Sequence, residues 1–298
     1  QANLKRRRPG QSSITTARQE MDEPEILSGI YQNKTLGTPI CVVVRNQDQK
    51  SSDYDVVLAQ PRIGHADDTW KIKFGHSDHR GGGRSSGRET LCRVIAGSFA
   101  QMLCQKIESQ IQVKSYSSQI GEFVLAPEEI KDLWSMNIDQ FTTRFPSERD
   151  PGIVKFLEMA KQEGESYGGV VETQVRGVPA GLGQPVFHKF KADLGAAMLS
   201  LGAVTGFEFG DGFGGVALKG TEFHHTMNSE SYGGIRGGIT TGDPLLFRVG
   251  FKPTSSRKDI SKKGRHDPCI VPRAVPVVEA MAWLTIADHL LWSRLDRA

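Results

Sequence analysis

The sequence has few cysteines, no long apolar run and no strong excess of one charge, and each shortage excludes a class of protein. Its 298 residues include four cysteines, and no two of them stand at the spacing of a zinc site. No apolar stretch approaches the roughly 18 residues of a membrane-spanning helix, and no signal peptide is recognised. The net charge of +3 at pH 7 is too small to indicate a polyanionic partner. We therefore expect no metal, no membrane and no nucleic acid as partners.

Three of the cysteines lie in segments that the apolar pattern predicts to be buried. Cys41 stands in a β-branched run, and Cys92 and Cys104 fall within one helical pattern. Cysteines that are small core residues rather than disulfide partners are typical of a reducing compartment. We therefore expect a cytoplasmic protein.

Glycine is abundant, with 33 residues, and much of it stands in short clusters. The clusters lie at 81–83, 214–215, 233–234 and 237–238. Clustered glycine indicates backbone that turns tightly or approaches a ligand closely. Basic residues are also local, at 5–8, 80–88 and 257–265. Local basic groups in a chain of modest net charge favour a small anionic ligand over a long polymer.

Hydrophobic spacing predicts one mixed α/β (α+β) domain. Strands are predicted over 38–45 (buried), 111–116, 169–178, 204–209, 216–219 and 245–251, and helices over 88–110, 187–201 and 274–295, with two short helices within 127–164. The strand–helix–strand order occurs twice, which suggests an internal pseudo-duplication. Residues 46–87 lack periodicity, and so long a loop is usually functional.

The strongest candidate site is the segment RGGGRSSGRET at 80–90, which leads into a predicted helix. Backbone N–H groups at a helix start favour an anion, and arginine adds bidentate phosphate donors. Ser85 or Ser86 is predicted to cap the helix. The alternative is a plain capped loop with solvated charges.

Three other polar segments are candidates. Asp267, between Arg265–His266 and a proline, is either a general base or the carboxylate of an ordinary turn. His65 is a loop histidine beside carboxylates that either titrates near neutral pH or is simply exposed. The KPTSS segment at 252–256 follows a predicted strand and suits a phosphate as well as it suits a polar turn. Residues 210–215 do not fit a dinucleotide fingerprint, because they lead into a predicted strand.

Taken together, these segments resemble chorismate synthase nearly end to end. The resemblance is carried by RRRPGQS (6–12), GHAD (64–67), RGGGRSSGRET (80–90), GVPAGLGQPVF (177–187), GGIRGGITTG (233–242), KPTSS (252–256) and GRHDPC with RAVP (264–276). It implies a β-α-β sandwich fold in a single domain over 1–298, a homotetramer and bound reduced FMN. The family's N-terminal strand and FGESHG-type motif do not stand before Gln1, and we expect the sequence to be incomplete there.

The resemblance also implies a reaction and its residues. The reaction is the 1,4-anti elimination of phosphate from 5-enolpyruvylshikimate 3-phosphate, the last step of the shikimate pathway. His65, Asp267 and Ser86 are implied as catalytic residues, with Asp267 receiving the proton and His65 protonating the reduced flavin. FMN-binding residues are implied at Arg84, Ser85, Ser86, Gly202, Ala203, Gly237, Lys252, Pro253, Thr254, Ser255, Ser256 and Arg265. Substrate-binding residues are implied at Arg7, Arg62, His65, Arg88 and Arg273.

Two alternatives stand beside this prediction. A nucleic-acid-binding protein would use RRRP and RGGGR as backbone contacts and would lose affinity steeply with salt. A non-catalytic relative would bind FMN weakly, although the intact GHAD and GRHDPC segments argue against it. No separate nicotinamide site is recognised, so an external flavin reductase or another source of reduced flavin is expected as a partner. NADP is then expected to act at that reductase and not at this chain.

Overall fold

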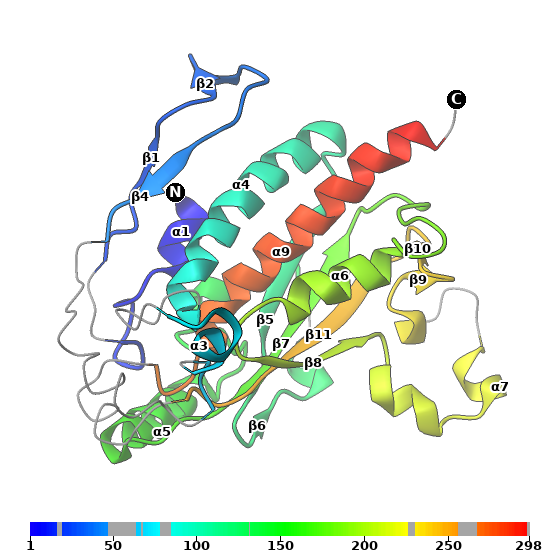
Figure 1. The fold of residues 1–298 in the computed structure, drawn as a ribbon. Helices are drawn as coiled ribbons and strands as arrows, with labels where there is room; N and C mark the ends of the chain where they lie inside the picture. The colour runs from blue at the N-terminus through cyan, green and yellow to red at the C-terminus, as the bar shows by residue number, and fades with distance from the viewer. Residues whose placement is uncertain are drawn as a thin grey trace.

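A computed structural model describes residues 1–16, 20–46, 64–66, 68–77, 85–130, 132–225, 230–255 and 267–296. Its centre is a five-stranded antiparallel sheet in the order β6-β5-β7-β11-β8 (Figure 1). The strands are β5 (Gln112–Ile120), β6 (Phe123–Val124), β7 (Gly169–Arg176), β8 (Val204–Phe209) and β11 (Leu245–Phe251). In β11 every second residue is buried, from Leu245 to Phe251, because alternate side chains face the helices.

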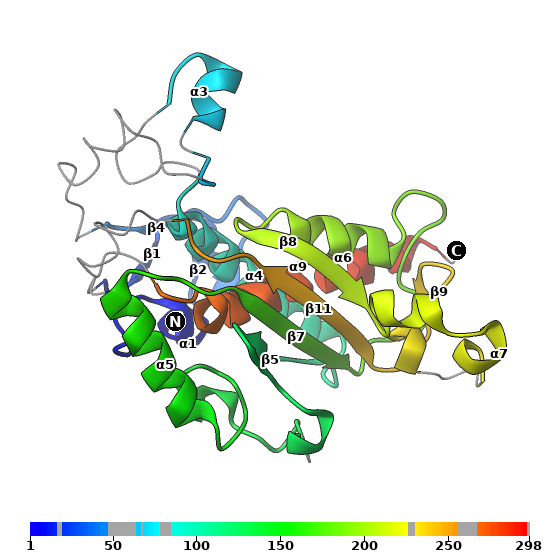
Figure 2. The same ribbon diagram turned by 90° about the horizontal axis from the view of Figure 1, so that it is seen from below.

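Three long helices pack on one face of this sheet. They are α4 (Thr90–Ile107), α6 (Phe190–Leu199) and α9 (Val271–Trp292). Figure 2 shows them behind the strands, with α9 between α4 and α6. Gly97 of α4 lies so close to Ala280 of α9 that an added Cβ would stand 2.6 Å from the Ala280 Cα. The core is therefore the layer between α9 and the sheet, to which α4 and α6 add.

Shorter elements complete the described chain. The helices are α1 (Ala2–Arg7), α3 (Thr69–Phe74), α5 (Asp150–Glu163) and α7 (Gly220–Phe223). The two-stranded pairs are β1 (Pro24–Ile26) with β4 (Val42–Val44), β2 (Ile30–Tyr31) with β3 (Lys34–Thr35), and β9 (Ile235–Arg236) with β10 (Ile239–Thr240). The 3₁₀ turns are η3 (Gly87–Glu89), η4 (Pro127–Glu129), η5 (Ile138–Gln140), η6 (Gly212–Ala217), η7 (Glu230–Tyr232) and η8 (Ser293–Leu295).

Several sequence predictions prove wrong. The strand expected to be buried over 38–45 shrinks to β4, which pairs with β1 in a two-stranded sheet and is half-buried. The β-branched run favours a strand, but burial requires a second layer, and the described residues supply none that buries this pair. Cys41 and Cys92 are exposed rather than core residues. The strand expected over 216–219 is replaced by η6, and Val216 is 80% exposed.

The predicted helices over 88–110, 187–201 and 274–295 are confirmed within a few residues, with α9 beginning earlier, at Val271. Of the two short helices expected within 127–164, only α5 is an α-helix. The mixed content fits the predicted α+β class. The described residues form one five-stranded sheet with three helices on one face, besides three two-stranded sheets, so the sandwich with internal duplication stays a prediction.

The core helix α9 is unusually apolar. By length and composition alone, Val271–Leu295 passes as a candidate membrane span, contrary to the expectation of no such stretch. Yet 78% of its apolar window is buried inside the protein, which is typical of a core helix. No other helix in the described part of the chain passes the same test.

Candidate active site

A cavity of about 470 Å³ lies where the starts of α4 and α9 meet the end of β11. Its lining includes Arg7, Glu20, Gly64, His65, Ala66, Ser85, Ser86, Gly87, Arg88, Thr90, Leu201, Gly202, Ala203, Phe251, Lys252, Pro253, Thr254, Ser255, Asp267, Ile270, Arg273 and Val277. These residues come from six separate stretches of sequence. Its size lies within the ~300–1,000 Å³ typical of small-molecule sites.

The serines before α4 belong to this lining. Ser86 caps η3, since its Oγ accepts a hydrogen bond from the Arg88 N–H at 3.3 Å. The predicted cap therefore lies on the 3₁₀ turn that leads into α4, whereas the N-cap of α4 itself is Glu89, which makes no side-chain cap bond. Ser85 Oγ accepts from Trp70 Nε1 at 2.6 Å. Trp70 stacks on Phe74 within α3, so an aromatic pair supports this edge of the cavity.

The end of β11 supplies a lysine and hydroxyl groups. Lys252 Nζ donates to the Gly64 carbonyl at 2.5 Å and to Ser255 Oγ at 3.0 Å. Ser255 Oγ also donates to the Gly64 carbonyl, at 2.8 Å. The Lys252 N–H donates to the carbonyl of Ala203, whose φ of +69° lies in the left-handed region. The KPTSS segment is thus tied both to the loop of His65 and to the turn after α6.

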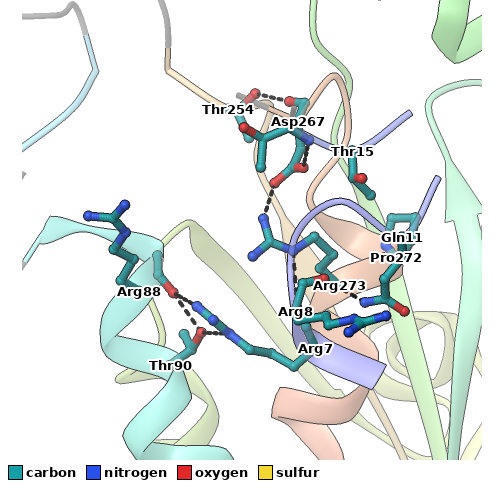
Figure 3. Close-up of polar contacts among 12 residues, drawn as sticks. Arg7, Arg8, Gln11, Thr15, Arg88, Thr90, Thr254, Asp267, Pro272 and Arg273 are labelled. Atoms are coloured by element: carbon teal, nitrogen blue, oxygen red, sulfur yellow. Dashed lines mark hydrogen bonds and ion pairs between the residues drawn. The ribbon is translucent and has the colours of Figure 1, made fainter. Parts of the chain in front are cut away.

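Asp267 is a buried carboxylate held by three elements (Figure 3). Its Oδ1 accepts from the Thr16 N–H at 2.9 Å, and its Oδ2 accepts from Arg273 Nη1 at 2.6 Å. Its backbone carbonyl accepts from Thr254 Oγ1 at 3.0 Å. The contacts with Thr16 and Arg273 fix the direction of both carboxylate oxygens beside the cavity.

Two further arginines reach the cavity, and each is paired with a carboxylate. Arg7 Nη1 lies 3.1 Å from Asp22 Oδ2, and both side chains are almost fully buried. Arg88 Nη2 lies 2.7 Å from Glu20 Oε1. Burial, and next the charge of Arg273, lower the pKa of Arg7 to about 10, while Asp22 and Glu20 oppose that shift. Arg7 is therefore still a cation at neutral pH. The basic side chains that line the cavity are those of Arg7, Arg88, Arg273 and Lys252.

The structure brings most of the predicted site residues together, with one exception. Gly237 lies in the β9–β10 turn with φ +61° and is not among the cavity-lining residues. This turn stands near the start of β11, whereas the cavity stands at its end. Seven residues of extended strand separate the two ends by roughly 20 Å. Arg62, Arg84, Ser256 and Arg265 lie outside the described residues.

Sequence reasoning missed four contributors to the site. They are Thr16, Glu20, Asp22 and Trp70. The acidic run from Glu20 to Glu25, close to a strongly basic one, was the available signal for two of them. It has no periodicity, so it did not indicate which arginines it would meet.

Comparison with known proteins decides what kind of site this is. A family model described as chorismate synthase matches residues 1–291. The chorismate synthase of Bdellovibrio bacteriovorus is 56% identical over 297 residues, which cover 99% of this chain and 87% of the relative. The chain belongs to the chorismate synthase family. The family's reaction is therefore that of this chain, a lyase that eliminates phosphate from 5-enolpyruvylshikimate 3-phosphate to give chorismate.

Two other chorismate synthases are also similar to this chain. That of Cytophaga hutchinsonii is 43% identical over 321 residues, covering 100% of this chain and 88% of the relative. A crystal structure of chorismate synthase matches with a TM-score of 0.71 at 29% identity, over 91% of this chain and 77% of that one. The nucleic-acid-binding alternative therefore falls away.

Proposed function

We propose that the elimination takes place in the cavity at the end of β11 and depends on reduced FMN bound there. The observation that carries this proposal is the convergence of separate motif segments on one cavity. His65, Ser86, Lys252, Asp267 and Arg273 are far apart in sequence, yet all of them line it. Such convergence of polar and titratable groups on a concave, partly apolar wall is characteristic of an active site.

The residues present fit FMN. A flavin needs an apolar wall for its ring and cationic or hydroxyl groups for its phosphate. Leu201, Phe251 and Ile270 contribute apolar surface, and Lys252 and Ser255 contribute the polar groups. Reduced FMN, when bound, supplies electron density that helps the allylic C–O bond break.

The substrate's phosphate and carboxylates require cations, and Arg7, Arg88 and Arg273 supply them. Arginine matches the planar geometry of both groups and stays charged when it is buried beside a carboxylate. Because Glu20, Asp22 and Asp267 already contact these arginines, the cavity carries charges of both signs rather than being simply basic. Such pairing holds the arginines in place before the substrate arrives.

We assign proton handling to two side chains. Asp267 holds its carboxylate between Thr16 and Arg273, which fixes its direction and makes it the acceptor for the proton that leaves the substrate. His65 lies across the same cavity as the donor that keeps the reduced cofactor neutral. Ser86 and the start of η3 complete the polar wall.

The remaining parts of the proposal concern partners and place. The family resemblance suggests a homotetramer. The cytoplasmic location and the external source of reduced flavin remain predictions from the sequence. The glycine-rich residues 210–215 do not fit a nicotinamide-binding fingerprint, because residues 212–215 belong to η6 and no long helix follows them directly. Under air, NADPH with oxidised FMN is therefore expected to give product only when a flavin reductase is added.

The test is an anaerobic assay of the purified protein with reduced FMN and 5-enolpyruvylshikimate 3-phosphate. Chorismate and phosphate are expected in equal amounts, and omission of the flavin is expected to abolish both. Product formation at the same rate without flavin would refute the cofactor proposal.

A further inference from the structure

Asp22 is a buried carboxylate beside the cavity, and the proposed function uses it only as one of three carboxylates paired with arginines. It is 7% exposed, and its Oδ2 lies 3.1 Å from Nη1 of Arg7. Arg7 in turn is 2% exposed, although it belongs to the cavity lining. The pair therefore sits at the boundary between the core and the site.

Arg7 is held by three acceptors that point it in one direction. Besides Asp22, its Nε donates to Thr90 Oγ1 at 3.2 Å and its Nη2 donates to the Gly87 carbonyl at 2.7 Å (Figure 3). Thr90 Oγ1 itself donates to the Gly87 carbonyl at 2.6 Å. A guanidinium has five N–H donors. Thr90, Asp22 and the Gly87 carbonyl accept three of these N–H groups. The other N–H groups of the Arg7 guanidinium remain for an anion in the cavity.

The stability of the fold does not by itself explain why Asp22 and Arg7 form a buried ion pair. A buried ion pair loses about as much in desolvation as it gains from attraction, so burial of Asp22 and Arg7 is weak evidence of a stabilising role. Asp22 also has φ +49°, a conformation that costs a residue other than glycine free energy and that is concentrated at functional sites. Burial raises the pKa of Asp22, and the charge of Arg7 opposes that change.

We propose that Asp22 is a positioning residue, which orients the guanidinium of Arg7 so that its remaining N–H groups meet an anionic group of the substrate. This inference rests on the proposed function, because it takes the cavity to be the substrate site. Asp22 touches no substrate itself. It acts through Arg7, together with Thr90 and the Gly87 carbonyl.

Asp22 also supports the charge of Arg7. Burial and Arg273 lower the pKa of Arg7 to about 10, and Asp22 and Glu20 are the carboxylates that oppose this. Removing the Asp22 carboxylate while Arg273 and Glu20 stay must lower that pKa further. Asp22 therefore helps to stabilise the cationic guanidinium of Arg7 in its buried position.

The first experiment measures steady-state kinetics of Asp22→Asn with reduced FMN under anaerobic conditions. KM for the substrate should rise roughly 10-fold, as expected for a lost hydrogen bond to a charged group, while kcat changes much less. A rise in KM without a matching fall in kcat indicates a lost contact with the substrate, whereas a general loss of structure would lower kcat as well. Glu25→Gln is the control, because Glu25 pairs with Arg45 at 3.9 Å on the exposed β1–β4 hairpin.

A double-mutant cycle with Arg7→Gln separates this inference from the proposed function. If Asp22 acts through Arg7, Asp22→Asn should add little to the KM of Arg7→Gln. Unchanged KM in Arg7→Gln alone would refute the assignment of Arg7 to the substrate. Raised KM in Arg7→Gln with unchanged KM in Asp22→Asn, or additive effects of the two, would overturn the positioning role only.

A second variant keeps the inference testable if Asp22→Asn does not fold. Thr90→Val removes the acceptor for Arg7 Nε and leaves the buried ion pair intact. KM should rise roughly 5-fold, as expected for a neutral hydrogen bond, and the effect should vanish in the Arg7→Gln background. A KM equal to that of the unchanged protein would contradict the inference.

Discussion

Arg273 Nη1 donates to Asp267 Oδ2 at 2.6 Å, which joins the first turn of the core helix α9 to the segment that precedes it. The Nε of the same arginine donates to the Arg7 carbonyl at 3.2 Å. One guanidinium therefore joins the proposed proton acceptor to α1, the helix that carries Arg7, a proposed substrate-binding residue. The positions of these two proposed groups are thus linked through Arg273.

Replacing the proposed acceptor tests this link. Asp267→Asn keeps an oxygen for the Thr16 N–H but turns an amide N–H toward Arg273, so it removes the base. We expect kcat to fall roughly 10²-fold or more, as for other general acid–base groups. Asp243→Asn is a matched control, since Asp243 accepts from Thr241 in a turn that does not line the cavity. Equal turnover of both variants would exclude Asp267 from the chemistry.

His65→Ala is the corresponding test for the second titratable group. The imidazole belongs to the cavity lining, and its loss should lower turnover by roughly 10²-fold in the anaerobic assay. His188→Ala provides the comparison, because His188 is exposed and lies outside the lining. A normal rate for His65→Ala would show that the cofactor is protonated by another group.

Lys252→Ala tests the flavin assignment without any turnover. Lys252 Nζ joins the end of β11 to Gly64 and Ser255, and it is the lysine expected to meet the flavin phosphate. Kd for oxidised FMN, measured by quenching of flavin fluorescence, should rise roughly 10-fold or more. Lys219→Ala, an exposed change outside the cavity, should leave Kd unaltered. Identical affinities would remove Lys252 from the flavin site.

The four cysteines should separate into two classes of reactivity. Cys41 and Cys92 are exposed, whereas burial raises the pKa of Cys104 to about 11 and that of Cys269 to about 12. Thiolate is the reactive form. At pH 8 a thiol reagent should therefore modify about two groups in the native protein and four after denaturation. Modification of all four at one rate would contradict the packing around α9.

A helix contact can be tested by adding one methyl group. Gly97→Ala would place a Cβ against the backbone of Ala280, so it should lower the free energy of unfolding by about 1–3 kcal/mol. Gly152→Ala in α5 has open space around the new Cβ, and it should be neutral or stabilising by up to about 1 kcal/mol. Urea unfolding of both variants measures the difference. Equal effects would mean that α4 and α9 do not approach at Gly97.

The local pattern of apolar residues was enough to predict a helix or strand wherever that pattern lies within the element itself. The apolar spacing of α4 and the alternation of β7 and β11 reflect a single buried face, and α9 is apolar over most of its length, so the sequence predicted all four elements. The prediction that the β-branched run at 42–44 is buried was wrong. Burial depends on a second layer of structure, and the sequence of the run itself does not specify that layer.

By itself, then, the sequence determined the long helices, the central strands and the motif segments that identify the family, because these depend on periodicity and on residue types at fixed spacing. Only the tertiary structure decided which segments meet. It joined Thr16 to Asp267, Glu20 to Arg88 and Asp22 to Arg7, and it placed Gly237 near the far end of β11 from Lys252. Those contacts arise from the sheet order and from chain reversals over long sequence separations, where no local spacing relates one partner to the other.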